Sequence, residues 1–203
     1  MERISDKDMD YFYSYLYSHA VPNHAIYGAF DRRAINFHEW IKPNVPEGSS
    51  ILEAGCGRGF LLRWLIAEDY KAEGTEIADF LLNPGGDLYG MPVRKLYYNE
   101  LGQIQDSSFD VVLSSDVIEH LQSEEDVVDG LKHLVRISRG PVLVSTGGLR
   151  QAHNPFPKVV KLYPGLHLVV RPKEWWKELY EKYCNIDKEF ESVGSYFLFG
   201  RKK

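Results

Sequence analysis

The feature that most constrains this chain is a glycine-rich turn between a short apolar strand and a helix. The strand is predicted over Ser50–Ala54, and the helical pattern opens at Leu61. Three glycines lie between them at alternate positions, Gly55, Gly57 and Gly59. Glycine lets the backbone turn sharply and lets a ligand approach the main chain. The helix N-terminus after the turn offers unpaired N–H groups to an anionic group. We therefore expect a nucleotide-type site at this turn.

The spacing of the glycines discriminates between ligands. A dinucleotide-binding turn has the pattern G-x-G-x-x-G, whereas this chain has Gly55-Cys56-Gly57-Arg58-Gly59 directly after Glu53. An acidic side chain at that place repels a pyrophosphate and suits a cationic or hydroxyl-rich ligand. The pattern therefore disfavours an NAD-dependent dehydrogenase. The simplest alternative is a glycine turn that binds no ligand.

A second acidic residue, Glu76, comes directly after the next predicted strand, which covers residues 70–75. It lies 21 residues after Gly55, close to the spacing expected for a carboxylate that accepts hydrogen bonds from the two ribose hydroxyls of a nucleotide. An acidic residue at such a position is common by itself. Together with Glu53 and the glycines, it predicts a ribose-containing ligand.

A further informative stretch is residues 108–121. Residues 109–115 form a nearly continuous apolar run, which predicts a strand buried on both faces of a parallel sheet. The run continues into Asp116-Val117-Ile118-Glu119-His120-Leu121. Polar residues directly after a parallel strand lie at the edge of the sheet where ligands bind.

These two stretches resemble a known family. The run 53–59 resembles the E/D-x-G-x-G-x-G signature of class I S-adenosylmethionine (SAM)-dependent methyltransferases. The run 108–121 resembles the S-F-D-x-V-x-x-x-x-V-x-E-H-x segment of their small-molecule members, of methyltransferase type 11 or 12. The resemblance covers about residues 49–145. It implies an α/β fold, with a Rossmann-like, mostly parallel sheet of seven strands, helices on both faces and an antiparallel final hairpin.

The resemblance also implies the cofactor and the residues that contact it. SAM would be bound at the glycine turn, and the ribose would be held by the acidic residue after the second strand. Members of the family often carry an acidic or amide residue after the third strand, which hydrogen-bonds the adenine amine. The expected SAM-binding residues are Glu53, Gly55, Cys56, Gly57, Gly59, Glu76, Ile77, Asn99 and Ser115.

The length of 203 residues fits a single domain over 1–203. In related methyltransferases an N-terminal helical segment, here residues 1–46, covers the cofactor and substrate sites; the alternative is a segment that only covers the sheet. Residues 149–172 show no clear periodicity and are rich in aromatic residues and proline. We expect them to form an insertion on the substrate side.

Charge and cysteine content exclude several classes of function. A net charge of −5 argues against broad nucleic-acid binding, which needs a basic face. Two cysteines, Cys56 and Cys184, do not make a disulfide framework and indicate a reduced, cytoplasmic environment. The charged N-terminus is unlike a signal peptide, and no apolar run approaches the roughly 18 residues of a membrane span.

The residues after the fourth predicted strand constrain the acceptor. The Asn/Asp-Pro-Pro-Tyr motif of base-nitrogen methylation is replaced there by Ser114-Ser115-Asp116-Val117. A hydroxyl, or else a small-molecule carboxylate or amine, is therefore favoured over a nucleobase nitrogen. SAM is already reactive, so the protein mainly positions the acceptor and removes its proton. The candidate catalytic residues are His120, His153 and Asp116.

The same segment offers a candidate metal site. Asp116, Glu119 and His120 are spaced i, i+3 and i+4, which would place them on one helix face around Mg²⁺ or Mn²⁺. The spacing resembles the E-x-x-E-H cluster of ubiquinone-biosynthesis O-methyltransferases and small-RNA 2′-O-methyltransferases, with Asp in place of the first Glu. The alternative is a Glu-His pair that packs near the SAM carboxylate without a metal.

The sequence thus predicts a SAM-dependent methyltransferase that acts on a sugar or glycan hydroxyl or a similar small hydroxylated acceptor, with or without a divalent metal. The first alternative is a carboxyl or N-methyltransferase of a small metabolite. The alternative from another class is a non-catalytic SAM-binding module that acts through partners. The intact glycine turn, Glu76 and the pair Glu119-His120 argue against such a degenerate module.

Overall fold

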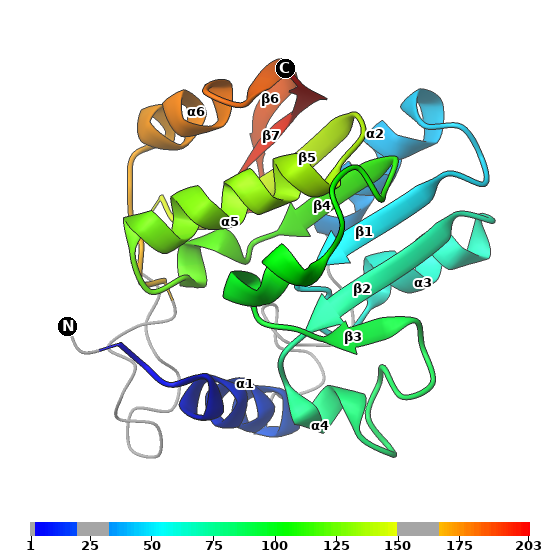
Figure 1. Cartoon of the computed structure of the whole chain (residues 1–203), viewed down its shortest axis with the longest axis vertical. Helices are drawn as coiled ribbons and strands as arrows, with labels where there is room; N and C mark the ends of the chain where they lie inside the picture. The colour runs from blue at the N-terminus through cyan, green and yellow to red at the C-terminus, as the bar shows by residue number, and fades with distance from the viewer. Residues whose placement is uncertain (1–2, 20–32, 150–166) are drawn as a thin grey trace.

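The computed structural model describes residues 3–19, 33–149 and 167–203, which fold around one seven-stranded sheet (Figure 1). The strand order is β3-β2-β1-β4-β5-β7-β6. Strands β1 to β5 run parallel, and β7 pairs antiparallel with both β5 and β6. This confirms the predicted sheet and its final hairpin. The strands are β1 (Ser50–Ala54), β2 (Lys71–Glu76), β3 (Val93–Lys95), β4 (Val111–Ser115), β5 (Pro141–Thr146), β6 (Cys184–Ser192) and β7 (Ser195–Lys202).

Helices cover both faces of the sheet (Figure 1). One core lies between the sheet and α5 and α6, and includes Leu131, Leu134 and Trp176. The second core lies between the sheet and α2 and α3, and includes Phe37 and Leu65. The α-helices are α1 (Asp6–His19), α2 (Arg33–Asn44), α3 (Phe60–Ala67), α4 (Asp79–Leu82), α5 (Glu124–Ile137) and α6 (Lys173–Glu181), and the 3₁₀ helices are η1 (Tyr98–Gln103) and η2 (Ile118–His120).

The central strands are buried on both faces, as their apolar runs predict. Ile51 on β1 pairs with Val111 on β4, and Leu113 pairs with Leu143 on β5. These side chains are at most 1% exposed. Successive side chains of each strand point to opposite faces and are buried in the two cores. Strands β1, β4 and β5 therefore form the buried centre of the sheet. Their carboxyl ends define the edge where the site is built.

Three local predictions differ from the structure. The third strand was expected over residues 93–98, but β3 ends at Lys95 and η1 begins at Tyr98. The second helix was expected to end before Pro43, whereas α2 runs to Asn44 with Pro43 in its last turn. The N–H of Val45 still reaches the carbonyl of Ile41 at 2.9 Å, so the final turn closes around the proline.

The third difference concerns the segment after β4. Asp116 has a φ of 50°, and only residues 118–120 form a single 3₁₀ turn. The prediction that Asp116, Glu119 and His120 share one helix face was therefore wrong. The i, i+3, i+4 spacing applies only to a continuous α-helix, and the backbone reverses at Asp116 before the turn begins.

Helix α1 lies at the edge of the sheet toward which the parallel strands point (Figure 1). It packs against α4 through Asp10, whose Oδ1 accepts a hydrogen bond from the Asp79 backbone N–H at 2.9 Å. The other oxygen of Asp10 pairs with Lys95 Nζ at 2.6 Å. These contacts fix the N-terminal helix to the ends of β2 and β3, 69 and 85 residues away in the chain.

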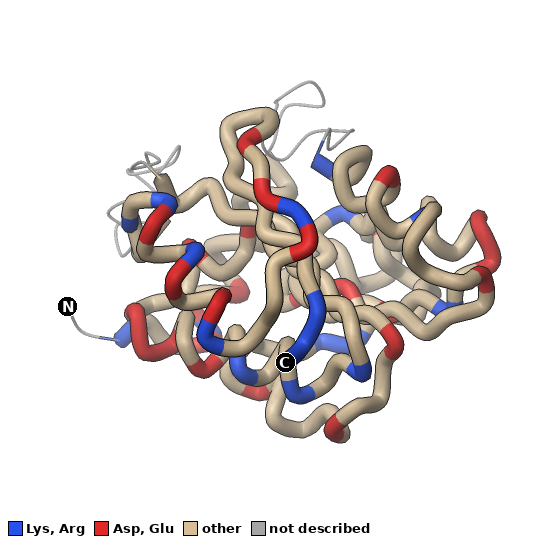
Figure 2. Tube along the Cα trace, turned by 90° about the horizontal axis from the view of Figure 1, so that it is seen from above, with Lys and Arg blue, Asp and Glu red and all other residues tan. Residues whose placement is uncertain are grey.

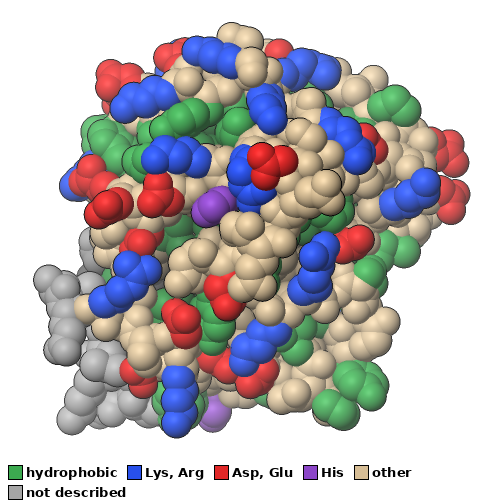
Figure 3. All heavy atoms as spheres, viewed as in Figure 1, with side chains coloured by type: hydrophobic (Ala, Val, Ile, Leu, Met, Phe, Trp, Pro, Cys, Tyr) green, Lys and Arg blue, Asp and Glu red, His purple; other side chains and the backbone are tan. Residues whose placement is uncertain are grey.

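Charged side chains are dispersed over the molecule. Figure 2 shows both acidic and basic residues distributed along the chain, with the two signs close together in the final hairpin. On the face in Figure 3, Lys and Arg side chains are interspersed with Asp and Glu. This agrees with the net charge of −5. In the described ranges, every helix is too short or too polar to cross a bilayer.

Candidate active site

The glycine turn between β1 and α3 has the left-handed backbone that its sequence predicts. The φ angles of Gly55, Gly57 and Gly59 are 77°, 52° and 73°, a region that favours glycine. The N–H groups of Gly55 and Cys56 both donate to the carbonyl of Thr75, at 3.0 and 2.8 Å. A Cβ on Gly55 would lie 2.6 Å from the Val117 side chain. The turn is thus held against the ends of β2 and β4.

Glu76 connects this turn to the end of β2. One carboxylate oxygen accepts from the Gly57 N–H at 2.9 Å, and the other accepts from the N–H groups of Ile77 at 2.9 Å and Ala78 at 3.1 Å. Burial raises the pKa of the Glu76 carboxyl, and these three N–H groups oppose that rise. Because each carboxylate oxygen can accept about two hydrogen bonds, the oxygen that accepts from Gly57 can accept one more.

Glu53 and Cys56 lie inside the same end of the sheet. Glu53 is 4% exposed on β1, in register with Gly74 on one side and Leu113 on the other. The Cys56 sulfur would lie 2.8 Å from a Cβ on Gly74, so Gly74 leaves the space that Cys56 fills. Burial and the nearby Glu53 raise the pKa of the Cys56 thiol. Cys56 is therefore a neutral packing residue.

The C-terminal half of α1 lies over the glycine turn. Arg58 donates from Nη2 to the carbonyl of Tyr17 at 2.7 Å, and its guanidinium lies 5.5 Å from the centre of the Tyr17 ring. The same guanidinium pairs with Asp87. A Cβ on Gly57 would lie 3.0 Å from the Tyr17 hydroxyl. An aromatic side chain therefore covers the part of the turn where a ligand would approach.

Asp116, at the end of β4, is held by three side chains. Its carboxylate pairs with Arg33 at the start of α2 and accepts hydrogen bonds from the hydroxyls of Ser145 on β5 and Ser195 on β7. Its backbone N–H donates to the carbonyl of Ser145 at 3.1 Å. The hydroxyl of Ser115, the preceding residue, lies 3.5 Å from the Ser145 hydroxyl. Asp116 thus joins four elements of the fold.

Glu119 is completely buried beside this cluster. Its Oε1 accepts from the Gly147 N–H at 2.6 Å, and its Oε2 has no hydrogen-bond partner among the described residues. Burial, with a contribution from the nearby Asp116 charge, raises the pKa of the Glu119 carboxyl to about 8. The backbone carbonyl of Glu119 accepts from Leu168 and Val169 at 2.9 and 3.0 Å. The segment that begins at residue 167 is therefore anchored to η2.

Two histidine rings meet at this place. The centres of the His120 and His167 rings are 5.1 Å apart at an interplanar angle of 86°. His167 Nε2 lies 4.0 Å from Glu119 Oε1, and the Tyr13 ring of α1 lies 6.1 Å from that of His120. One donor atom from each of Glu119, His120 and His167 lies within 4.8 Å of the others.

The sequence-predicted residues thus separate into two groups at one sheet edge. The glycine turn, Glu53 and Glu76 gather at the ends of β1 and β2, while Asp116, Glu119 and His120 lie after β4. The sequence analysis missed His167, because a single histidine in an irregular segment carries no local signal. His153 lies outside the described residues.

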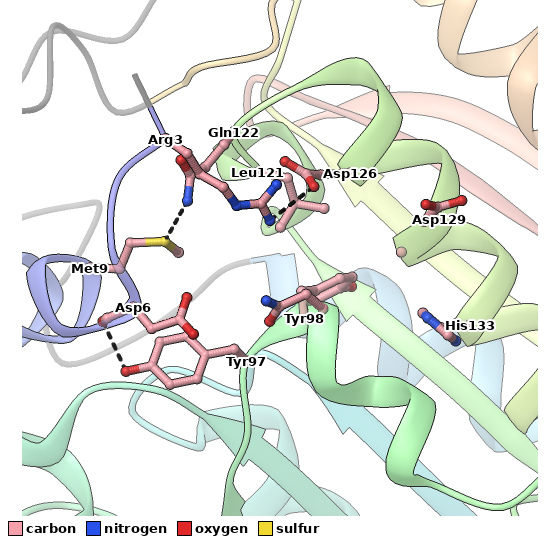
Figure 4. Close-up of a pocket in the computed structure, with 12 residues that line it drawn as sticks. Arg3, Asp6, Met9, Tyr97, Tyr98, Leu121, Gln122, Asp126, Asp129 and His133 are labelled. Atoms are coloured by element: carbon pink, nitrogen blue, oxygen red, sulfur yellow. Dashed lines mark hydrogen bonds and ion pairs between the residues drawn. The ribbon is translucent and has the colours of Figure 1, made fainter. Parts of the chain in front are cut away.

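Asn99 lines a cavity of about 140 Å³ between α1, η1 and α5 (Figure 4). Arg3 forms an ion pair with Asp126 at 3.1 Å across the cavity rim. The Tyr97 hydroxyl donates a hydrogen bond to the carbonyl of Asp6 at 2.9 Å. The hydroxyl of Tyr98, in the same wall, donates to Ser114 on β4 at 2.6 Å. This bond ties one wall of the cavity to β4.

Comparison with known proteins identifies the class. Residues 52–140 match the family described as a methyltransferase domain. That range contains the glycine turn, Glu76 and the whole segment from β4 to the end of α5. Comparison with curated proteins found no match. The match covers a little under half of the chain. Together with the fold and the motif order described above, it supports a class I SAM-dependent methyltransferase, an enzyme that transfers a methyl group from SAM.

Solved structures share the fold at low sequence identity. The PH0226 protein from Pyrococcus horikoshii has a TM-score of 0.71 and 15% identity, and the match covers 92% of this chain and 98% of that one. The SAM-bound magnesium protoporphyrin IX methyltransferase of Synechocystis has a TM-score of 0.67 and 15% identity over 100% of both chains. A SAM-dependent methyltransferase from Mesorhizobium loti has a TM-score of 0.60 and 15% identity, covering 81% and 96%.

Proposed function

We propose that this methyltransferase acts on a hydroxyl of a sugar, a glycan or a similar small hydroxylated acceptor. The observation that carries this proposal is the pair of imidazoles of His120 and His167, 5.1 Å apart, beside the buried Glu119. An imidazole can accept the proton that a hydroxyl loses when it attacks the methyl group. The histidines lie at the carboxyl ends of β4 and β5, next to the cofactor edge of the sheet.

The proposed cofactor site is the glycine turn with its two acids. Glu76 would accept hydrogen bonds from the ribose hydroxyls through the oxygen that faces Gly57. Glu53, Cys56, Ile77 and Ser115 would line the rest of the bound SAM, and Asn99 would contact the adenine from the η1 side. The N-terminus of α3 would face the anionic end of the cofactor, because unpaired backbone N–H groups favour negative charge.

Residues 1–46 are proposed as a segment that covers the cofactor and acceptor. The contacts of Tyr17 with Arg58 and the approach of its hydroxyl to Gly57 support this role. If it is correct, bound S-adenosylhomocysteine, the demethylated product, should slow proteolytic cleavage within α1. Unchanged cleavage would indicate that α1 only covers the sheet. The role of residues 149–172 as a substrate-side insertion and the cytoplasmic location remain predictions.

The acceptor chemistry has two alternatives. A carboxylate or amine of a small metabolite could take the methyl group in the same site, and a non-catalytic SAM-binding module would bind cofactor without turnover. His120 and His167 support hydroxyl methylation over carboxylate methylation, because a carboxylate is already deprotonated and needs no base. Assistance by a divalent cation, predicted from the sequence as Mg²⁺ or Mn²⁺, is a further part of the proposal, and the donor set described below favours a transition metal in its place.

A methyl-transfer screen tests the acceptor. The purified chain would be incubated with SAM labelled in the methyl group and with panels of sugars, nucleotide sugars, phenols, carboxylic acids and amines. Transfer to the hydroxylated panel is expected, with a rate that falls in His120→Ala. Transfer only to acids or amines would contradict the acceptor proposal. SAM binding without transfer to any panel would favour the non-catalytic module.

A further inference from the structure

We propose that Glu119, His120 and His167 bind one transition-metal cation of the Zn²⁺ or Co²⁺ type at the carboxyl ends of β4 and β5. The site differs from the sequence-predicted cluster in both its ligands and its metal: His167 takes the place of Asp116, and a transition metal takes the place of Mg²⁺. Binding of the cation does not depend on methyl transfer. Its suggested role toward the acceptor rests on the proposed function.

The three donor groups are already close to a ligating arrangement. One donor atom of each residue lies within 4.8 Å of the others. Ligands at about 2.1 Å from a tetrahedral ion lie about 3.4 Å from one another. The most distant donors must therefore close in by up to about 1.4 Å.

The buried carboxylate points to a missing ligand. Glu119 is completely buried, and its Oε2 has no hydrogen-bond partner among the described residues. A buried carboxylate oxygen without a partner is costly and rare in folded proteins. The oxygen nearest to His167 is Oε1, at 4.0 Å from His167 Nε2. A cation between the carboxylate and the two imidazoles would therefore satisfy Oε2 by binding both carboxylate oxygens. The other oxygen is oriented by the Gly147 N–H at 2.6 Å, as the carboxylate ligands of metal sites usually are.

The surrounding backbone is shaped to bring the ligands together. The carbonyl of Glu119 accepts from Leu168 and Val169, which fixes His167 beside η2. Gly147 leaves the necessary space, since a Cβ there would lie 3.0 Å from His167 Cε1 and 3.1 Å from Glu119 Oε1. Any larger residue at 147 would press on two of the three ligands. The cluster is therefore supported by two separate chain segments.

The donor set selects the metal. Two imidazoles and one carboxylate suit Zn²⁺, Co²⁺ or Fe²⁺, whereas Mg²⁺ prefers oxygen ligands alone. Asp116, the only other carboxylate of the predicted cluster, is held by Arg33, Ser145 and Ser195. Three protein ligands leave a coordination position open for water or an acceptor oxygen. With a cation bound, the two imidazoles would be its ligands and would no longer accept a proton. The cation would then take over activation of the acceptor, by lowering the pKa of its hydroxyl and orienting it.

Cobalt titration of the purified chain tests the site directly. The protein would be freed of metal with a chelator, dialysed and titrated with Co²⁺, with the visible absorption of the bound ion as the readout. We expect one Co²⁺ per chain, displaced by Zn²⁺ and not by Mg²⁺. Glu119→Gln and His167→Ala should weaken binding by about 100-fold or more, as loss of a ligand requires.

Two control variants locate the ligands. His133→Ala removes an imidazole on α5 outside the cluster, and Asp116→Asn removes the charge of the alternative ligand while keeping a side chain that tolerates a positive φ. Both should retain Co²⁺ affinity within about threefold, because neither supplies a donor atom to the proposed ligand set. Thermal unfolding of each variant checks that it folds.

Two results would overturn the proposal. One is the absence of stoichiometric binding of Co²⁺ or Zn²⁺ to the folded wild-type chain. The other is binding that survives in His167→Ala and is lost in Asp116→Asn. Calorimetry with S-adenosylhomocysteine on the metal-free protein distinguishes a failure of the metal proposal from a failure of the proposed function. Cofactor binding without metal binding would leave the methyltransferase assignment intact.

Discussion

The backbone N–H of Gly57 donates a hydrogen bond to the Glu76 carboxylate across 2.9 Å. This bond joins the two sequence signals of the cofactor site, which lie 19 residues apart in the chain. The glycine turn is therefore held in shape by the same carboxylate that is proposed to bind the ribose. Any change at Glu76 should alter both the shape of the turn and its affinity for cofactor.

Replacement of Glu76 tests the ribose contact. Glu76→Gln keeps the volume of the side chain and removes its charge, and hydrogen bonds to a charged group contribute about 1.5–3 kcal/mol. We therefore expect S-adenosylhomocysteine to bind about 10- to 100-fold more weakly by calorimetry. Glu73→Gln is the matched control, because Glu73 lies on the same strand and pairs with Arg94 at the surface. If Glu76→Gln bound S-adenosylhomocysteine as tightly as Glu73→Gln, Glu76 would not contact the cofactor.

Two glycines with a positive φ separate steric effects from backbone strain. Gly57→Ala would place a Cβ 3.0 Å from the Tyr17 hydroxyl, whereas Gly85→Ala meets nothing within 4 Å. Both substitutions force an L-residue into an unfavourable backbone region, which costs about 1–2 kcal/mol. Both should therefore lower stability in chemical denaturation, but only Gly57→Ala should also weaken cofactor binding, by about tenfold. A similar affinity loss in Gly85→Ala would contradict a local role for the turn.

The buried Glu119 predicts a pH-dependent stability of the metal-free protein. Its carboxyl pKa is about 8 in the folded state, above the ordinary 4.5. The folded state then holds a proton that the unfolded state has lost between these values. The stability associated with Glu119 is thus fully present below about pH 4.5 and declines as pH rises through about 8.

Glu119→Gln isolates this effect from the other charged or imidazole side chains around it, Asp116, Arg33 and His167. The variant cannot ionise, so its unfolding free energy should fall less between about pH 5 and pH 9 than that of the wild type, by an amount on the order of a few kcal/mol. Urea denaturation in the presence of a chelator measures the difference. Parallel pH profiles for the two proteins would show that the Glu119 carboxyl is ionised normally.

The cluster around Asp116 predicts a difference between two substitutions. Asp116 has a φ of 50° and accepts hydrogen bonds from Arg33, Ser145 and Ser195. Asn tolerates this backbone and keeps one oxygen acceptor, whereas Ala loses every acceptor and adds strain. We expect Asp116→Ala to destabilise the protein by about 2–4 kcal/mol and Asp116→Asn by about half as much. A fully stable Asp116→Ala variant would show that these contacts contribute nothing.

The sheet could be predicted from the sequence because its signals are local. The apolar runs at 50–54, 109–115 and 142–145 are buried central strands, and the glycines of the turn adopt the backbone that glycine favours. The ends of the helices and strands were harder to predict, as in the case of β3, which ends at Lys95. Tyrosine is common in strands, but Tyr98 begins η1, where its hydroxyl donates a hydrogen bond to Ser114. That tertiary contact cannot be inferred from the local pattern.

The site after β4 was only partly predictable for the same reason. Glu119 and His120 are adjacent in the sequence, and their motif drew attention to them. Arg33 and Ser195, which hold Asp116, and His167, which meets His120, come from segments 83, 79 and 47 residues away. Such contacts depend on how helices and the final hairpin pack on the sheet. A single sequence does not reveal those pairings.

The most direct test of the cofactor site is isothermal titration calorimetry of the purified chain with SAM and with S-adenosylhomocysteine, with NAD as the negative control. We predict saturable binding of one molecule of either sulfur compound per chain, weakened in Glu76→Gln, and no heat with NAD. The absence of binding to both SAM and S-adenosylhomocysteine by folded protein would contradict the central claim that the glycine turn and Glu76 form the cofactor site.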